Sequence, residues 1–181
     1  MALLTDTEIA LDPEKEYEIV NGQPEEKIMG GARHGRIGHR LGRKIGNHTE
    51  ALDLGEVYGP DTTFLIGTNE RLPDVAFISR ERMPATGEPE GRWEIVPDLA
   101  VEIISPNDVY EKVLTKVLEY LEAGVRQVWL VAPEQQMITL FRSPTELQVF
   151  TASQTLTCED LLPGFRCELR ELFRAPGAKQ S

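Results

Sequence analysis

Apolar residues along this chain recur in two spacings, every second position in short runs and every third or fourth position in longer ones. The first short runs, residues 17–20 and a run that ends at residues 28–29, flank the dipeptide Asn21-Gly22. Asn-Gly between two such runs is the strongest short signal for a tight β-hairpin. We therefore expect an N-terminal hairpin, preceded by a loosely ordered arm over residues 1–15.

A longer segment, residues 32–53, has the helical spacing and predicts the first helix. Its apolar positions are four residues apart: Ile37, Leu41 and Ile45. A second set four apart consists of glycines, namely Gly38, Gly42 and Gly46. Each glycine costs roughly 1 kcal/mol against alanine inside a helix, so this stripe indicates a side that another element approaches closely. Gly55 is a plausible stop for the helix.

Several strand signals follow this helix. Residues 57–58 and 62–66 are apolar runs that we expect to pair with each other across residues 59–61. Residues 74–79 form the next run, and residues 80–97 are a long polar loop rich in proline and glycine. Loops of that length in a compact domain are often functional.

The second half opens with a buried strand at residues 99–104, followed by a helix that ends at Ala123. We expect Asn107 or Asp108 to cap this helix and Gly124 to stop it. Its predicted core stripe comprises Val109, Val113, Val117 and Leu121. A continuous apolar strand follows at residues 127–131.

The C-terminal part shows one more hairpin, between residues 137–141 and 147–150. Residues 161–165 pack a tail, and residues 174–181 are expected to be frayed. The helix between residues 99–104 and 127–131 predicts a parallel strand pair, because parallel neighbours need a crossover connection. The chain thus reads as one α/β domain over residues 1–181, a mixed sheet flanked by helices with a hairpin at each end.

Composition is that of a soluble globular protein, with 40% hydrophobic and 27% charged residues in 181. Two cysteines, Cys158 and Cys167, have no nearby histidine and no second pair, which argues against a zinc module and a disulfide scaffold. No run approaches the roughly 18 apolar residues of a membrane span, and the N-terminus lacks the pattern of a signal peptide. We expect a cytoplasmic protein.

The net charge of −11 bears on possible partners. Phosphate contacts dominate non-specific affinity for nucleic acids, so an acidic protein is repelled by DNA at long range. Any activity on nucleic acid therefore needs a metal, a partner or a locally basic face. The densest basic run lies between Arg33 and Lys44, but it spreads around the predicted helix and is better explained as a solvated surface.

Two carboxylates in or beside apolar runs are the strongest chemical signal. Asp74 follows Pro73 at the start of one strand, and Glu102 lies inside the apolar run of the next. A carboxylate in such a run costs desolvation energy unless something pairs with it. The following helix carries Lys112, Lys116 and Tyr120 on one stripe. Two carboxylates and a lysine converging at strand ends would suit a divalent-metal site that cuts phosphodiesters.

The same segments, taken in order, carry a family resemblance. The set comprises Pro73-Asp74-Val75-Ala76-Phe77-Ile78, Val101-Glu102-Ile103-Ile104-Ser105-Pro106-Asn107-Asp108, Lys116, Tyr120, Gly124-Val125, Val128-Trp129-Leu130-Val131 and Leu162-Pro163-Gly164-Phe165. It resembles the Uma-type restriction endonucleases, within the PD-(D/E)XK nuclease superfamily. The resemblance implies a restriction endonuclease-like core in the order helix–strand–strand–strand–helix–strand.

The resemblance also implies residue roles and partners. Asp74 and Glu102 would hold Mg²⁺ or Mn²⁺. The superfamily lysine stands two residues after the second acid, where this chain has Ile104; the Uma-type pattern moves it to the following helix, where Lys116 matches. Glu18 and His34 match further, accessory positions. DNA is the implied substrate, and a homodimer is expected because nucleases of this fold often pair to cut two strands.

Each candidate also has a purely structural explanation. Aspartate is common at turns, so Asp74 alone is weak. Glu102 could face solvent on an edge strand, and Lys116 could pair with a glutamate of its own helix. Glu18 and His34 could be ordinary surface residues. The leading hypothesis is a Mg²⁺-dependent endonuclease; the alternative, favoured by the charge and the displaced lysine, is a non-catalytic nuclease-fold domain that acts as a binding module.

Overall fold

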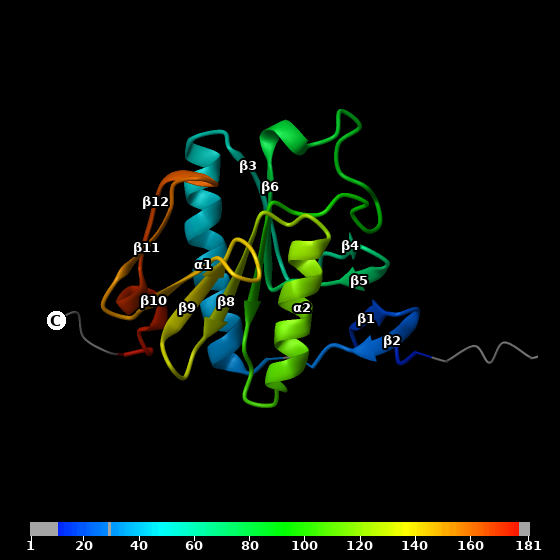
Figure 1. Ribbon diagram of the computed structural model, residues 1–181, viewed down its shortest axis with the longest axis horizontal. Coiled ribbons are helices and arrows are strands. Elements are labelled where there is room, and N and C mark those ends of the chain that lie inside the picture. Colours follow the sequence, from blue (N-terminus) through cyan, green and yellow to red (C-terminus); the bar gives the residue numbers. More distant parts are fainter. Residues whose placement is uncertain (1–10, 29, 178–181) are drawn as a thin grey trace, which may run out of the picture.

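A six-stranded mixed sheet forms the centre of the computed structural model, which describes residues 11–28 and 30–177 (Figure 1). The strand order is β10-β9-β8-β7-β6-β3. The bounds are β10 Leu147–Thr151, β9 Met137–Phe141, β8 Gln127–Ala132, β7 Leu99–Ile103, β6 Val75–Ser79 and β3 Gly55–Tyr58. Strands β7 and β8 run parallel, as predicted, and the other neighbours are antiparallel.

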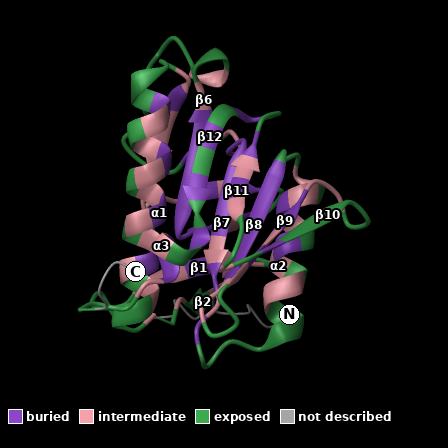
Figure 2. Ribbon diagram, turned by 90° about the vertical axis from the view of Figure 1, so that its left-hand side faces the viewer, coloured by how far each residue is buried: buried purple, intermediate pink, exposed green. Residues whose placement is uncertain are grey.

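Helices cover the two faces of this sheet. Helix α1, Ala32–Ala51, packs on one face, and helix α2, Tyr110–Glu122, packs on the other. Alternation along β7 sends Val101 and Ile103 toward α1 and Ala100 toward α2, so both faces are buried (Figure 2). The predicted α/β sheet flanked by helices is confirmed.

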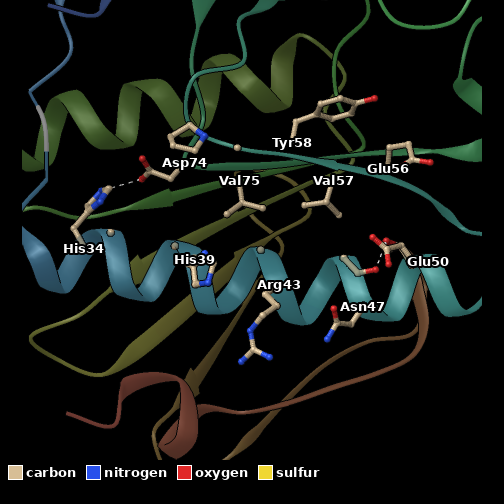
Figure 3. A pocket seen from close by; sticks show the side chains of 17 residues that line it. His34, His39, Arg43, Asn47, Glu50, Glu56, Val57, Tyr58, Asp74 and Val75 are labelled. Atoms are coloured by element: carbon tan, nitrogen blue, oxygen red, sulfur yellow. Dashed lines mark hydrogen bonds and ion pairs between the residues drawn. The ribbon is translucent and has the colours of Figure 1, made fainter. Parts of the chain in front are cut away.

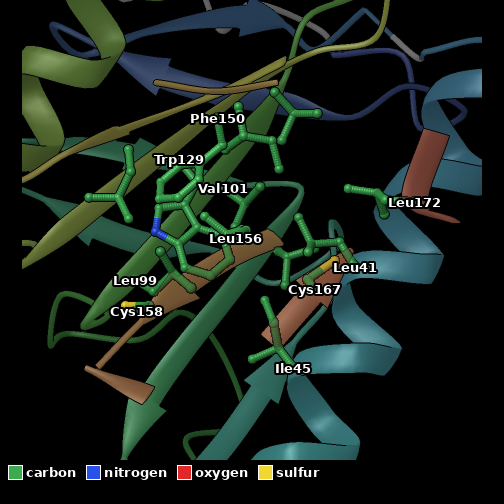
Figure 4. Packing of buried hydrophobic residues seen from close by; sticks show 14 of the residues in the cluster. Leu41, Ile45, Leu99, Val101, Trp129, Phe150, Leu156, Cys158, Cys167 and Leu172 are labelled. Carbon is green, nitrogen blue, oxygen red and sulfur yellow. The ribbon is translucent and has the colours of Figure 1, made fainter. Parts of the chain in front are cut away.

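The larger core lies on the α1 face (Figure 4). There the predicted stripe of α1 meets Trp129, which is fully buried, and a C-terminal layer covers the rest. This layer consists of β11 Thr155–Cys158, β12 Leu162–Glu168 and α3 Leu169–Phe173. Cys158 and Cys167 are both free thiols within it. The 137–141 and 147–150 hairpin is confirmed as β9 and β10.

A second, four-stranded sheet has the order β2-β1-β5-β4. The predicted N-terminal hairpin supplies β1 Tyr17–Val20 and β2 Gln23–Glu26, while β4 Phe64–Ile66 and β5 Asn69–Arg71 form another hairpin. Between β1 and β2, Asn21 and Gly22 have φ angles of 51° and 74°, which suit a two-residue hairpin turn. The two hairpins meet where Ile19 pairs with Glu70.

The expected pairing of residues 57–58 with 62–66 is wrong. Strand β3 pairs with β6 in the large sheet, and β4 pairs with β5 in the small one. Strand β5 is polar throughout, so the spacing of apolar residues gave no sign of it. Gly55 does not stop the helix, which ends at Ala51; it opens β3 with φ of 143°, and a Cβ there would lie 2.1 Å from the carbonyl oxygen of Ile78.

The predicted start of α2 is also wrong. Its N-cap is Val109, and no side chain caps the helix. Asp108 accepts a hydrogen bond from the backbone N–H of Ser105 instead, at 2.7 Å. Because the helix starts late, Val109 is exposed, and the fully buried positions are Val117 and Tyr120. Within residues 80–97, a 3₁₀ turn spans Arg80–Arg82, and Trp93 is buried.

The ends of the chain lie partly outside the described residues. The predicted arm over residues 1–15 is described only from residue 11, and the predicted frayed tail over 174–181 only to residue 177. The expectation of one domain over residues 1–181 stays a prediction. Across residues 11–28 and 30–177, the helices are too short or too polar to cross a bilayer.

Candidate active site

The site lies where strand β7 ends beside the start of strand β6. Val75 pairs with Val101, so the next residues along the two antiparallel strands are Asp74 and Glu102. The backbone N–H of Asp74 donates to the carbonyl of Val101 at 3.0 Å. Its side chain accepts the backbone N–H of Ile103 at 2.8 Å. This hydrogen bond fixes the Asp74 carboxylate at the end of the sheet.

Two basic side chains reach Asp74 from outside the sheet. Nε2 of His34, in the first turn of α1, lies 3.1 Å from Oδ2 of Asp74, and Nζ of Lys27 lies 3.8 Å from Oδ1. Burial alone would raise the Asp74 pKa, but these groups and the Ile103 N–H outweigh it and lower the pKa. The hydrogen bond with Asp74 in turn raises the pKa of His34.

Glu102 points toward α2. Its Oε1 lies 3.0 Å from Nζ of Lys116 and accepts the Tyr120 hydroxyl at 2.7 Å. Its side chain is only 12% exposed. Burial, with the neighbouring charges of Asp74 and Glu18, raises the Glu102 pKa to about 7 despite Lys116. A carboxylate in this state gains strongly from an additional nearby cation.

Lys116 joins Glu102 to the N-terminal hairpin. Its Nζ lies 2.7 Å from Oε1 of Glu18, on β1. Burial would lower the Lys116 pKa, but Glu102 and Glu18 outweigh this and raise it, so the amine stays charged. Glu18 also accepts the Leu72 N–H at 2.9 Å, and its pKa is lowered in spite of burial.

The structure therefore brings the sequence-predicted residues together, and it adds others that no pattern indicated. Arg71, on β5, donates to Glu18 at 2.9 Å and forms a second ion pair with Glu119 of α2. Arg71 and Lys27 come from polar stretches without periodicity, so only the tertiary fold identifies them. Lys112 stays on the surface, 3.8 Å from Glu25.

Two grooves open beside these groups. The α2 groove has a volume of about 410 Å³ and lies between the N-terminal hairpin and α2; Glu18, Asp74, Glu102 and Lys116 line it. The α1 groove has a volume of about 610 Å³ and lies between α1 and strands β3 and β6 (Figure 3). Asp74 and His34 line both grooves.

The donor set fits a hard divalent cation. Oδ1 of Asp74 accepts no hydrogen bond among the described residues and has only Lys27 at 3.8 Å. Glu102 carries a pKa that an added cation would lower. Within the described part of the chain, no three His, Cys, Asp or Glu side chains form a complete metal cage. Mg²⁺ ordinarily takes one or two carboxylates and completes its shell with water and substrate phosphate, and this is the number of carboxylates that Asp74 and Glu102 would supply.

Comparison of the sequence with known protein families identifies the family of this chain. The family model Uma2, described as "Putative restriction endonuclease", matches residues 5–170. The chain belongs to this family. The resemblance drawn from the ordered sequence segments is confirmed, and membership indicates a nuclease.

A solved structure shows the same fold. It is described as the crystal structure of "a putative nuclease" from Anabaena variabilis, and it superposes with a TM-score of 0.80 at 22% sequence identity. The similarity covers 90% of this chain and 92% of the other. No curated protein matches the sequence.

Proposed function

We propose that this Uma2-family protein is a Mg²⁺- or Mn²⁺-dependent endonuclease that hydrolyses phosphodiester bonds in DNA. The observation that carries the proposal is the contact of Lys116 with Glu102 in a groove that Asp74 also lines. Two acids and a charged amine are thereby held at one end of the sheet. This is the combination that metal-assisted attack of water on a phosphodiester needs.

Asp74 and Glu102 would hold the cation in this site. When bound, the cation would stabilise charge on the scissile phosphate and lower the pKa of a bound water. Glu102 must be ionised to serve as a ligand, and its pKa of about 7 lets it lose its proton as the cation arrives. Asp74, with a lowered pKa, is already ionised.

Lys116 is proposed to orient the attacking water and to offset negative charge that develops on the phosphate. Its raised pKa keeps it cationic, and Glu18 also contacts the ammonium, at 2.7 Å. His34 has a positioning role, because its Nε2 holds one oxygen of Asp74. Glu18 and His34 thus support the groups that would contact the metal and substrate.

The first test is metal binding, measured as the shift in melting temperature on addition of Mn²⁺ or Mg²⁺. A ligand that binds only the folded state raises the melting temperature. We expect a rise for the wild type and none for Glu102→Gln, which keeps the size of the side chain and removes its charge. A binding module that lacks a metal site would show the same melting temperature with and without Mn²⁺.

A homodimer and a cytoplasmic location both stay predictions. Two copies would present two sites to the two strands of a duplex. Sedimentation equilibrium of the purified protein, alone and with DNA, measures the oligomeric state directly.

A further inference from the structure

The α1 groove is the larger of the two hollows, and the proposed chemistry uses only its inner end. Figure 3 shows His34 and Asp74 at one end of this groove and Glu50 and Glu56 at the other. Val57 and Val75 form its apolar wall on the strand side. At about 610 Å³ it falls within the size range of small-ligand sites.

The glycine stripe of α1 keeps this groove open. Gly38, Gly42 and Gly46 all line it. A Cβ on Gly42 would lie 3.6 Å from a methyl group of Val75, whereas a Cβ on Gly46 would have nothing within 4 Å. Any larger side chain at Gly46 would therefore occupy space that is now empty. Gly38 and Gly42 let α1 pack closely on the sheet, since a Cβ on Gly38 would lie 3.2 Å from the Ile103 side chain. Of the three glycines, Gly46 alone faces open space, so its helix-propensity cost has no such packing reason.

Acidic side chains lie at the rims of both grooves. Glu25, Asp108 and Glu111 are exposed at the α2 groove, which Lys27, Lys112 and Lys116 also line. These acids favour entry of a cation, and the lysines can balance a substrate phosphate beside it.

Donor groups flank the α1 groove along the length of the helix. His39, Arg43 and Asn47 follow one another along the outer side of α1 at its rim (Figure 3). Among the described residues, their side chains form no hydrogen bond or ion pair. They are therefore available to a ligand that carries negative charge.

We propose that the α1 groove binds an unpaired nucleotide of the nucleic acid strand, next to the phosphate that reaches Asp74. The position next to the scissile phosphate rests on the proposed nuclease function. The phosphate side of the nucleotide faces His39 and Arg43. The base lies beside Val57 and Gly46, with its edge toward the acceptors Glu50 and Glu56.

Each part of the groove matches this occupant. Phosphate contacts from arginine and histidine position a strand, while carboxylate oxygens accept hydrogen bonds from the amino groups of bases. At Gly46, where nothing lies within 4 Å of a Cβ position, a flat ring can approach the helix backbone. The size of the groove suits one nucleotide and not a duplex, so the strand must be unpaired or its base turned outward.

Filling the groove is the first arm of the test. The probe is a fluorescein-labelled single-stranded DNA oligonucleotide, with binding followed by fluorescence anisotropy. Gly46→Leu should weaken binding about tenfold or more, whereas Gly46→Ala should bind like the wild type. Both variants should melt at or above the wild-type temperature, because leucine and alanine favour helix more than glycine does. Equal binding by the two variants would overturn the proposal.

Charge at the rim is the second arm. Arg43→Gln should weaken binding several-fold and reduce the slope of log affinity against log salt by about 1, as loss of one phosphate contact requires. The matched control is Lys44→Gln, which removes the same charge from the next position on α1, outside the groove. Equal salt slopes for the two variants would contradict the proposed phosphate contact.

These outcomes separate the groove from the nuclease function. If single-stranded DNA binding is lost in Gly46→Leu but wild-type protein cuts no DNA in Mn²⁺, the groove is a nucleic-acid site and the nuclease proposal fails. If wild-type protein and Gly46→Leu cut and bind DNA alike, the nuclease proposal stands and the groove proposal fails. A wild-type protein that does not bind the oligonucleotide at all also overturns the groove proposal.

Discussion

Nζ of Lys116 lies 3.0 Å from Oε1 of Glu102, although the two residues belong to different elements 14 positions apart. The residue two positions after Glu102, where the superfamily pattern places its lysine, is the apolar Ile104. Helix α2 lies over the sheet face toward which Glu102 points, and its Lys116 contacts the Glu102 carboxylate. A lysine therefore lies beside the second acid in the folded chain, although it is displaced in the sequence.

Removing this amine should destabilise the protein. Lys116→Met leaves Glu18 and Glu102 as buried acids without their common cation, so we expect the free energy of unfolding to fall by roughly 3 kcal/mol at about pH 8. Urea denaturation measures it. Lys116→Arg keeps the charge and should lose clearly less. If the methionine variant were as stable as the wild type, the ion pairs with Glu18 and Glu102 would not hold this region.

Stability should fall as pH rises toward neutrality. The folded-state pKa of Glu102, about 7, exceeds its ordinary 4.5, so the folded protein binds more protons than the unfolded chain between these values. Protonated Glu102 therefore adds up to roughly 3 kcal/mol to the free energy of unfolding. This contribution is fully present below about pH 4.5 and is lost as the pH rises through about 7.

Glu102→Gln removes this contribution, and the comparison isolates it. The His34 pKa is also raised, which gives a slope of the same sign, but His34 is retained in both proteins. Unfolding free energies at about pH 5 and about pH 8 should differ less in the variant than in the wild type. Identical differences would mean that Glu102 is not protonated in the folded state.

Arg40 and Arg43 of α1 should differ in their contribution to stability, which a matched pair of variants measures. Arg40 donates to the backbone carbonyls of Leu172 at 3.1 Å and Arg174 at 2.7 Å, at the end of α3. Arg40→Ala should lower the free energy of unfolding by about 1 to 2 kcal/mol, because it removes the side-chain donor of the Leu172 carbonyl and leaves the Arg174 carbonyl with Arg36 alone.

Arg43→Ala is the control, since Arg43 is exposed and forms no ion pair or hydrogen bond with any described residue. Its effect should stay within about 0.5 kcal/mol. Thermal denaturation of both variants provides the comparison. A loss in Arg43→Ala as large as that in Arg40→Ala would contradict the assignment.

Short sequence patterns predicted the parts of the fold that depend on residues close together in the chain. The Asn21-Gly22 hairpin follows from turn chemistry, and the parallel pair of β7 and β8 follows from two apolar runs joined by a helix. Strand β5 could not be found this way. Asn69-Glu70-Arg71 is polar throughout, and it becomes a strand because it pairs with β4 and meets β1. Pairing partners far along the chain leave no local pattern.

The site was predictable to a similar degree. Asp74 and Glu102 attract attention because charged residues are costly in or beside apolar runs, and the family pattern selected Lys116, Glu18 and His34. The structure gathers all five around two adjoining grooves. The cations that balance the acids, such as Arg71 and Lys27, come from polar segments of the small sheet and its neighbouring loop. Their contribution depends on how the two sheets meet.

Metal-dependent cleavage of DNA tests the central claim most directly. Supercoiled plasmid is incubated with purified wild-type protein or Glu102→Gln, each in Mn²⁺, in Mg²⁺ and in EDTA, and strand breaks are counted on a gel. The account predicts nicked or linear DNA only when both wild-type protein and metal are present. The cleavage rate of the variant should be lower than that of the wild type by a factor of about 100 or more. Equal cleavage by both proteins, or no cleavage by a wild type that binds Mn²⁺, would contradict it.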